Sequence, residues 1–131
     1  MILDSSAIIE IALGNPGYEK YLNAITEAPV RLLSAVNLYE TAVVLFKKRG
    51  TTEAITSLYA LLKTLKVEIV AFDLAEANSA VAVYTVFGKG VHPAKLNLGD
   101  CPAYALAKRK KLPLLFKGDD FAQTDIERVV F

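Results

Sequence analysis

The chain has 131 residues, of which 53% are hydrophobic, and its formal net charge at pH 7 is +1. These values exclude a disordered chain and predict one domain, residues 1–131, that is long enough to bury a core. No apolar run approaches the roughly 20 residues of a membrane span, and the N-terminal MILDSS lacks the basic flank of a signal peptide. We therefore expect a soluble, cytoplasmic protein without strong bulk attraction to nucleic acid.

Short apolar segments alternate along the chain with longer segments of helical periodicity. The segments predicted as strands are 1–4, 30–33, 67–72 and 112–116, with 129–131 as a last edge strand. The segments predicted as helices are 5–13, 16–27, 35–49, 52–65, 75–87 and 100–110. Ser5 or Ser6 is expected to cap the first helix and Gly14 to end it. Glycines and a proline between 88 and 99 predict a loop.

Apolar strands separated by helices are typical of a parallel sheet that helices cover on both faces, which is an α/β fold. In such sheets the functional crevice lies outside the carboxyl ends of the strands. The positions of acidic residues relative to the strand ends are therefore informative.

Several carboxylates fall where such a crevice is expected. Asp4 ends the first strand, Asp119 and Asp120 follow the strand that begins near 112, and Asp100 opens a helix just before that strand. Glu40 lies in mid-helix beside apolar residues, although a single Glu in that position is ordinarily a solvated helix former. Carboxylates brought close together repel one another, and a divalent cation removes that conflict. Hard oxygen ligands suit Mg²⁺ or Mn²⁺.

Four motifs in order along nearly the whole chain resemble the PIN domain, and most closely its VapC branch of ribonuclease toxins. They are MILDSSAII at the start, SAVNLYE at 34–40, LNLGDCPAYALAK at 96–108 and LLFKGDDFAQTDI at 114–126. The resemblance implies a three-layer α/β/α sandwich with a mainly parallel central sheet. It also implies a cluster of three or four acids that binds Mg²⁺ or Mn²⁺.

Carried over by position, the resemblance assigns the metal-binding and catalytic roles to Asp4, Glu40 and Asp100. Many relatives have Thr-x-Asp for the fourth acid, whereas this chain has Lys-Gly-Asp-Asp. We place the fourth role on Asp119, with Asp120 as the second choice.

Residues around the acids have supporting roles, of which the serine's comes from the same resemblance. Ser6, or Ser5, is expected to orient the first aspartate, and Gly99 is expected to let the backbone turn tightly into the helix that Asp100 opens. Asp125 is a turn or cap residue, or supports the site from behind its ligands.

The resemblance implies a toxin that hydrolyses RNA internally and leaves a 5′-phosphate and a 3′-hydroxyl. It implies a homodimer and a VapB-like antitoxin whose C-terminal tail covers the groove, where an arginine would compete for the acids. Four basic residues are candidates to contact the RNA backbone, and ordinary solubility explains them equally well. They are Lys89, His92, Lys95 and Lys117.

Three other interpretations of the same residues stay open. The first is a non-catalytic PIN-like module that binds RNA or a partner. The second is an acid-cluster phosphatase or nuclease that acts on DNA or small phosphoesters, and the third, less favoured, is a flavodoxin-like or response-regulator domain. Cys101 and His92 are the only residues of their kinds, so cysteine zinc clusters are excluded and a serine hydrolase is poorly supported. Cys101 is expected to be a small core residue.

Overall fold

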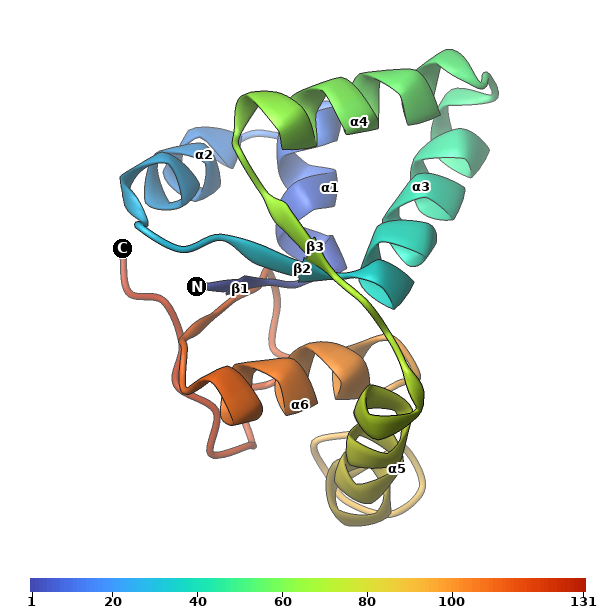
Figure 1. Ribbon diagram of the computed structural model, residues 1–131, viewed down its shortest axis with the longest axis vertical. Helices are drawn as coiled ribbons and strands as arrows, with labels where there is room; N and C mark the ends of the chain where they lie inside the picture. Colours follow the sequence, from blue (N-terminus) through green and yellow to red (C-terminus); the bar gives the residue numbers. More distant parts are fainter.

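The computed structural model describes the whole chain, residues 1–131, and contains a four-stranded sheet in the order β3-β2-β1-β4 (Figure 1). All the strand pairs are parallel. The strands are β1 (Ile2–Leu3), β2 (Leu32–Ser34), β3 (Glu68–Val70) and β4 (Leu114–Leu115). Each overlaps a predicted strand, and the predicted parallel sheet is confirmed.

Six helices connect the strands and agree with the predicted helices to within a few residues. They are α1 (Ser5–Leu13), α2 (Tyr18–Glu27), α3 (Ala35–Arg49), α4 (Glu53–Thr64), α5 (Leu74–Phe87) and α6 (Asp100–Lys110). In Figure 1, α5 and α6 lie on the opposite side of the sheet from α1, α2 and α4. None of these helices combines the length and the apolar character that crossing a membrane requires.

Side chains of the strands alternate between two apolar cores, one on each face of the sheet. A first core contains leucines from three strands together with side chains of α1 to α4. A second contains Ile2, Leu32 and Leu114, the strand neighbours of those leucines, together with side chains of α5 and α6. Because successive strand residues point to opposite faces, this alternation produces three layers, and the expected α/β/α sandwich is confirmed.

Two local predictions are wrong. Residues 129–131 form no edge strand. The pairing with β4 is limited to one isolated bridge between Leu114 and Arg128, and after the Val129 N–H donates to the Leu114 carbonyl no further ladder bond follows. Neither predicted serine caps α1. Asp4 is the N-cap residue, and its carboxylate accepts the backbone N–H of Ser6.

Candidate active site

The carboxyl ends of β1 and β4 lie side by side at one edge of the sheet. Leu3 pairs with Leu115, and the backbone N–H of Asp4 donates to the Leu115 carbonyl at 2.9 Å. The acids that follow these two strands therefore begin at the same edge, as the sequence predicts for Asp4 and the Asp119–Asp120 pair.

Asp4 is buried at this edge and is held by Ser6. Its Oδ2 accepts the Ser6 backbone N–H at 3.0 Å and the Ser6 hydroxyl at 2.6 Å. The Ser6 Oγ in turn accepts the backbone N–H of Lys117 at 2.9 Å, which links α1 to the segment after β4. Ser5 points elsewhere, because its Oγ donates to the Asn37 carbonyl. Of the two candidate serines, Ser6 is the one that orients Asp4.

Asp100 opens α6 and is also buried, with an exposed fraction of 5%. Its Oδ2 accepts the backbone N–H of Asn97 at 3.0 Å, and the Asn97 side chain accepts the N–H groups of Gly99 and Asp100. This reciprocal turn satisfies backbone groups that would otherwise be unpaired at the helix start. No protein hydrogen bond reaches the Asp100 Oδ1, which leaves it available to a ligand.

Gly99 is needed here for space and not for backbone freedom, which corrects the sequence prediction. Its dihedral angles are φ −80° and ψ −31°, in the ordinary helical region. A Cβ at this position would lie only 2.7 Å from Cδ of Glu40 and closer still to one of its oxygens. The Glu40 carboxylate therefore packs directly against the backbone at the start of α6, next to Asp100.

Burial and the charges of neighbouring carboxylates raise the pKa of the two buried aspartates, Asp4 and Asp100. Burial, followed by the charges of Glu40 and Asp120, raises the pKa of Asp4 from 3.8 to about 6, although the Ser6 hydrogen bonds oppose the shift. Burial, followed by the charges of Asp4, Asp120 and Glu40, raises the pKa of Asp100 from 3.8 to about 7. The four carboxylates thus form one electrostatically coupled group.

The fourth member of this group is Asp120, the second choice of the sequence prediction. Its charge raises the pKa of both Asp4 and Asp100. Both Asp119 and Asp120 are exposed in the turn that follows Gly118, whose φ of +96° is a conformation that favours glycine. The coupling favours Asp120 for the site, and the role given to Asp119 stays a prediction.

The chemistry of these side chains fits a divalent cation. The salt bridges of the structure all involve other acids, so Asp4 and Asp100 are buried without a cationic partner. No three His, Cys, Asp or Glu side chains form a ready-made metal cluster in this structure. Buried, unpaired and oxygen-only ligands at a strand edge are the donor set that Mg²⁺ and Mn²⁺ prefer.

Asp125 lies away from this cluster. Its carboxylate accepts hydrogen bonds from the Tyr104 hydroxyl and from Lys108, at 2.8 Å for the lysine. The Lys108 and Tyr104 hydrogen bonds lower the pKa of Asp125, whereas burial and Asp125 itself raise the pKa of Tyr104. Asp125 therefore ties the C-terminal segment to α6.

The four candidate RNA-contacting residues separate into two groups. The Lys117 side chain forms an ion pair at 2.8 Å with Glu10, a buried acid of α1 that sequence reasoning did not select. Burial alone would raise the pKa of Glu10, but hydrogen bonds from Lys117 and Asn15 outweigh it, so the pKa is lowered. Lys117 thereby anchors the turn that carries Asp120.

The other three lie in the loop between α5 and α6. Lys89 and Lys95 are exposed. His92 accepts the Ala94 backbone N–H through Nδ1 and packs edge-on against Phe87. Contact of this loop with RNA stays a prediction.

Cys101 is buried next to Asp100. Burial, followed by the Asp100 charge, raises the pKa of its thiol to about 11. Cys101 belongs to the second apolar core, and the prediction of a small core residue is confirmed.

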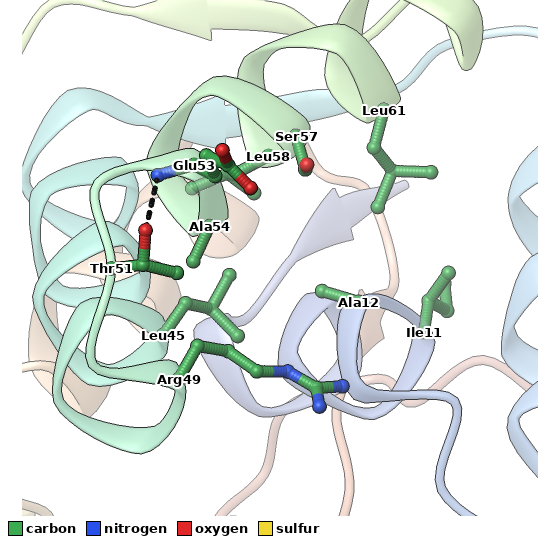
Figure 2. A pocket seen from close by; sticks show the side chains of 10 residues that line it. All are labelled: Ile11, Ala12, Leu45, Arg49, Thr51, Glu53, Ala54, Ser57, Leu58 and Leu61. Atoms are coloured by element: carbon green, nitrogen blue, oxygen red, sulfur yellow. Dashed lines mark hydrogen bonds between the residues drawn. The ribbon is translucent and has the colours of Figure 1, made fainter.

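A well-formed pocket of about 470 Å³ lies elsewhere, between the C-terminal halves of α1 and α3 and the start of α4 (Figure 2). Arg49 and Glu53 line it together with apolar side chains, among them Leu45 and Leu58. The acid cluster is at the opposite, N-terminal ends of α1 and α3. Glu53 is the single carboxylate that lines this pocket, so the pocket lacks the set of oxygen ligands that the acid cluster offers.

Comparison with known proteins agrees with the fold and the motifs. The PIN domain family model matches residues 1–127. The chain is 40% identical over 129 residues to Ribonuclease VapC of Mycolicibacterium smegmatis, which covers 98% of this chain and 99% of that protein. It is 39% identical to Ribonuclease VapC30 of Mycobacterium tuberculosis, with 98% of both chains covered.

Solved structures share the fold at lower sequence identity. Mycobacterium tuberculosis VapC20, described as a sarcin-ricin loop cleaving toxin, superimposes with a TM-score of 0.79 at 16% identity over 98% of this chain and 97% of that one. A toxin–antitoxin complex from Klebsiella pneumoniae superimposes with a TM-score of 0.72 at 22% identity, covering 95% and 92%.

The parallel sheet, the acids at its edge and the full-length family match define the class: the chain belongs to the PIN domain family. Its full-length relatives are VapC ribonucleases, and the protein is a PIN-domain ribonuclease of the VapC type.

Proposed function

We propose that this protein is the toxin of a VapBC-type toxin–antitoxin pair and hydrolyses RNA phosphodiesters with Mg²⁺ or Mn²⁺ bound by Asp4, Asp100 and Asp120 and with Glu40 beside them as the general base. The observation that carries the proposal is a pair of buried aspartates without cationic partners, Asp4 and Asp100, at the carboxyl edge of a parallel sheet. Such a pair is unstable when ionised unless a cation joins it.

Each residue of the site has a distinct task in this proposal. Asp4, Asp100 and Asp120 hold the cation, and Ser6 keeps Asp4 in one orientation through two hydrogen bonds. Bound there, the cation supplies charge stabilisation at a phosphoryl oxygen and favours ionisation of water. Glu40 is less buried than the aspartates, and it accepts the proton of the attacking water. In-line attack breaks the bond to the 3′ oxygen, which takes up a proton and leaves as the 3′-hydroxyl.

The partners follow from the same assignment. A VapB-like antitoxin silences the protein by covering the acid groove with its C-terminal tail, and an antitoxin arginine suits the unpaired carboxylates. RNA approaches past the α5–α6 loop, where Lys89 and Lys95 are exposed. Solved relatives that are complexes with an antitoxin support this partner. We place the protein in the cytoplasm, where its RNA substrate is.

The expected homodimer has a suitable surface on α5. An apolar hollow of about 490 Å³ lies between α5 and the start of α6, and exposed Val81 and Leu98 contribute to it. An exposed apolar surface of this kind is removed from water when a second copy of the protein covers it. Sedimentation velocity of the antitoxin-free protein at micromolar concentration gives the mass, and a monomer there would contradict the assignment.

Cleavage of a mixed cellular RNA pool tests the proposed function directly. The antitoxin-free protein is expected to cut RNA with Mg²⁺ or Mn²⁺ and not with EDTA, and the products should carry 5′-phosphates. DNA and a small phosphodiester, assayed alongside, separate a ribonuclease from a general phosphoesterase. A folded protein that binds RNA and cuts nothing under any metal would support the non-catalytic module instead.

The neighbouring aspartates after β4 offer a matched pair of variants. Asp120→Asn is expected to lower the cleavage rate by about tenfold or more, the scale of losing a group that supports a metal site. Asp119→Asn, one residue away and equally exposed, is expected to change it by less than about threefold. The measurement is single-turnover cleavage at saturating metal, and a larger loss for Asp119→Asn would return the fourth role to Asp119.

A further inference from the structure

Asn37 is a fully buried side chain that the proposed mechanism does not use. It lies in the first turn of α3 with an exposed fraction of 0%. A carboxamide carries two donor hydrogens and an acceptor oxygen, and its burial is unfavourable unless these groups are bonded. Its position near the acid cluster therefore calls for a reason other than packing.

The Asn37 residue joins the two chain segments that carry the buried aspartates. Its Nδ2 donates to the Gly99 carbonyl at 2.9 Å, across 62 residues of sequence, and Gly99 immediately precedes Asp100. Its backbone carbonyl accepts the Ser5 hydroxyl at 3.1 Å, across 32 residues, and Ser5 immediately follows Asp4. One residue of α3 thus bonds to the neighbours of both aspartates.

Glu40 is on the same face of α3. Residues three apart on a helix are neighbours, and the Glu40 carboxylate packs against Gly99, the residue that the Asn37 amide holds. Two side chains of α3 therefore contact Gly99 at the start of α6. The Asn37 amide donates to its carbonyl, and the Glu40 carboxylate fills the space where a Cβ would lie.

The orientation of the amide is determined by its partner. The Gly99 carbonyl can only accept a hydrogen bond, so the nitrogen of Asn37 must face it and the oxygen must point away. That oxygen, Oδ1, is buried and is the one such side-chain atom of the structure without a hydrogen-bond partner. A buried acceptor without a donor disfavours folding, so stability alone does not explain an asparagine here.

We propose that Asn37 is a positioning residue of the acid cluster, whose amide fixes the start of α6 so that Asp100 meets the cation together with Asp4 and Glu40. This role rests on the proposed function for its catalytic consequence. The hydrogen bond to Gly99 itself can be tested without any activity.

Asn37→Leu is the informative variant, because leucine is similar in size and removes the unpaired oxygen together with the amide donor. Asn37→Ala is the second variant if leucine prevents folding. Thr41→Val is the matched control. Thr41 is equally buried and one turn further along α3, but its hydroxyl donates only to the Asn37 carbonyl within the same helix.

Three readouts are compared: amide hydrogen exchange over residues 97–104, the rise in Tm on adding Mn²⁺, and single-turnover RNA cleavage. Asn37→Leu is expected to keep the wild-type Tm in EDTA within a few degrees. It should exchange faster over 97–104, lose at least half of the Mn²⁺-induced Tm rise, and cleave at least tenfold more slowly in kcat with a smaller change in KM. Thr41→Val should lower the Tm and leave the other readouts as in the wild type.

Wild-type exchange over 97–104 together with a wild-type Mn²⁺ response in Asn37→Leu would overturn the proposal. Equal changes in Thr41→Val would also overturn it, since they would trace to general weakening of α3. If the wild-type protein cuts no RNA, the proposed function fails, whereas the exchange and Mn²⁺ readouts still decide the role of Asn37.

Discussion

Asp100→Asn is expected to stabilise the metal-free protein at pH 8 and to abolish RNA cleavage. In the folded protein the pKa of Asp100 is raised to about 7, far above its ordinary 3.8. Below about pH 4 the carboxyl is protonated in both the folded and the unfolded states and contributes no penalty. As the pH rises from about 4 through 7, the free energy of unfolding falls, because Asp100 ionises readily in the unfolded state but keeps its proton in the folded state up to about pH 7. Asparagine does not ionise and can still accept the Asn97 N–H.

The expected size follows from the shift. Each pKa unit corresponds to about 1.4 kcal/mol, and coupling to Asp4 divides the effect, so we expect a gain on the order of 2 kcal/mol at pH 8 in EDTA. Cleavage should fall at least about 100-fold, because a metal-binding oxygen is lost. Urea unfolding from pH 4 to 8, with EDTA or with Mn²⁺, measures the first effect.

Two controls make this result specific. Mn²⁺ should stabilise the wild type and not the variant, since a ligand stabilises only the state that binds it. Asp125→Asn removes a carboxylate that bonds to Lys108 outside the cluster, and it should retain cleavage. If the variant were less stable than the wild type at pH 8 without metal, the ionised Asp100 carboxylate would not be destabilising the folded protein.

Gly99→Ala is expected to lower cleavage by about 10- to 100-fold while changing the free energy of unfolding by less than about 1 kcal/mol. Gly99 has helical dihedral angles, so alanine fits the backbone without strain. The three atoms nearest to the new methyl group all belong to the carboxylate end of Glu40, so the methyl group would displace that carboxylate. Misplacement of a catalytic group by about 1 Å can reduce a rate about 100-fold. Chemical denaturation and single-turnover cleavage on the same samples measure both effects.

Gly50→Ala provides the opposite pattern. Gly50 ends α3 with a φ of +71° and has no neighbouring atoms where a Cβ would lie. Alanine there should cost about 1 kcal/mol of stability and leave the cleavage rate per folded molecule unchanged. In a Glu40→Ala background, Gly99→Ala should have little further effect. Full activity of Gly99→Ala would mean that Glu40 does not rest against Gly99 in the working enzyme.

Much of the architecture was predictable because it depends on local patterns. The alternation of apolar runs with helical periodicity predicted the parallel sheet. The carboxyl ends of β1 and β4 placed Asp4 and the Asp119–Asp120 pair at one edge of that sheet. The start of α6 at Asp100 was predicted from its sequence motif and is observed. These features follow from strand ends and helix starts, which neighbouring residues define.

The details of the site depend on contacts between residues far apart in sequence. Glu10 looks like an ordinary helix residue, and only its contact with Lys117, which lies beyond β4, shows that it anchors the acidic turn. Asn37 gives one usable signal, its position three residues before Glu40 on the same helix face. Its bond to the Gly99 carbonyl has no local signature.

The sequence by itself determined the fold class and predicted the edge of the sheet at which three candidate acids gather, because backbone direction and apolar periodicity are encoded locally. The tertiary structure decided which serine holds Asp4, why residue 99 must lack a side chain and which aspartate after β4 couples electrostatically to the buried pair. These choices depend on burial and on distances between side chains of different elements. Such quantities exist only once α1, α3 and α6 have packed around the sheet.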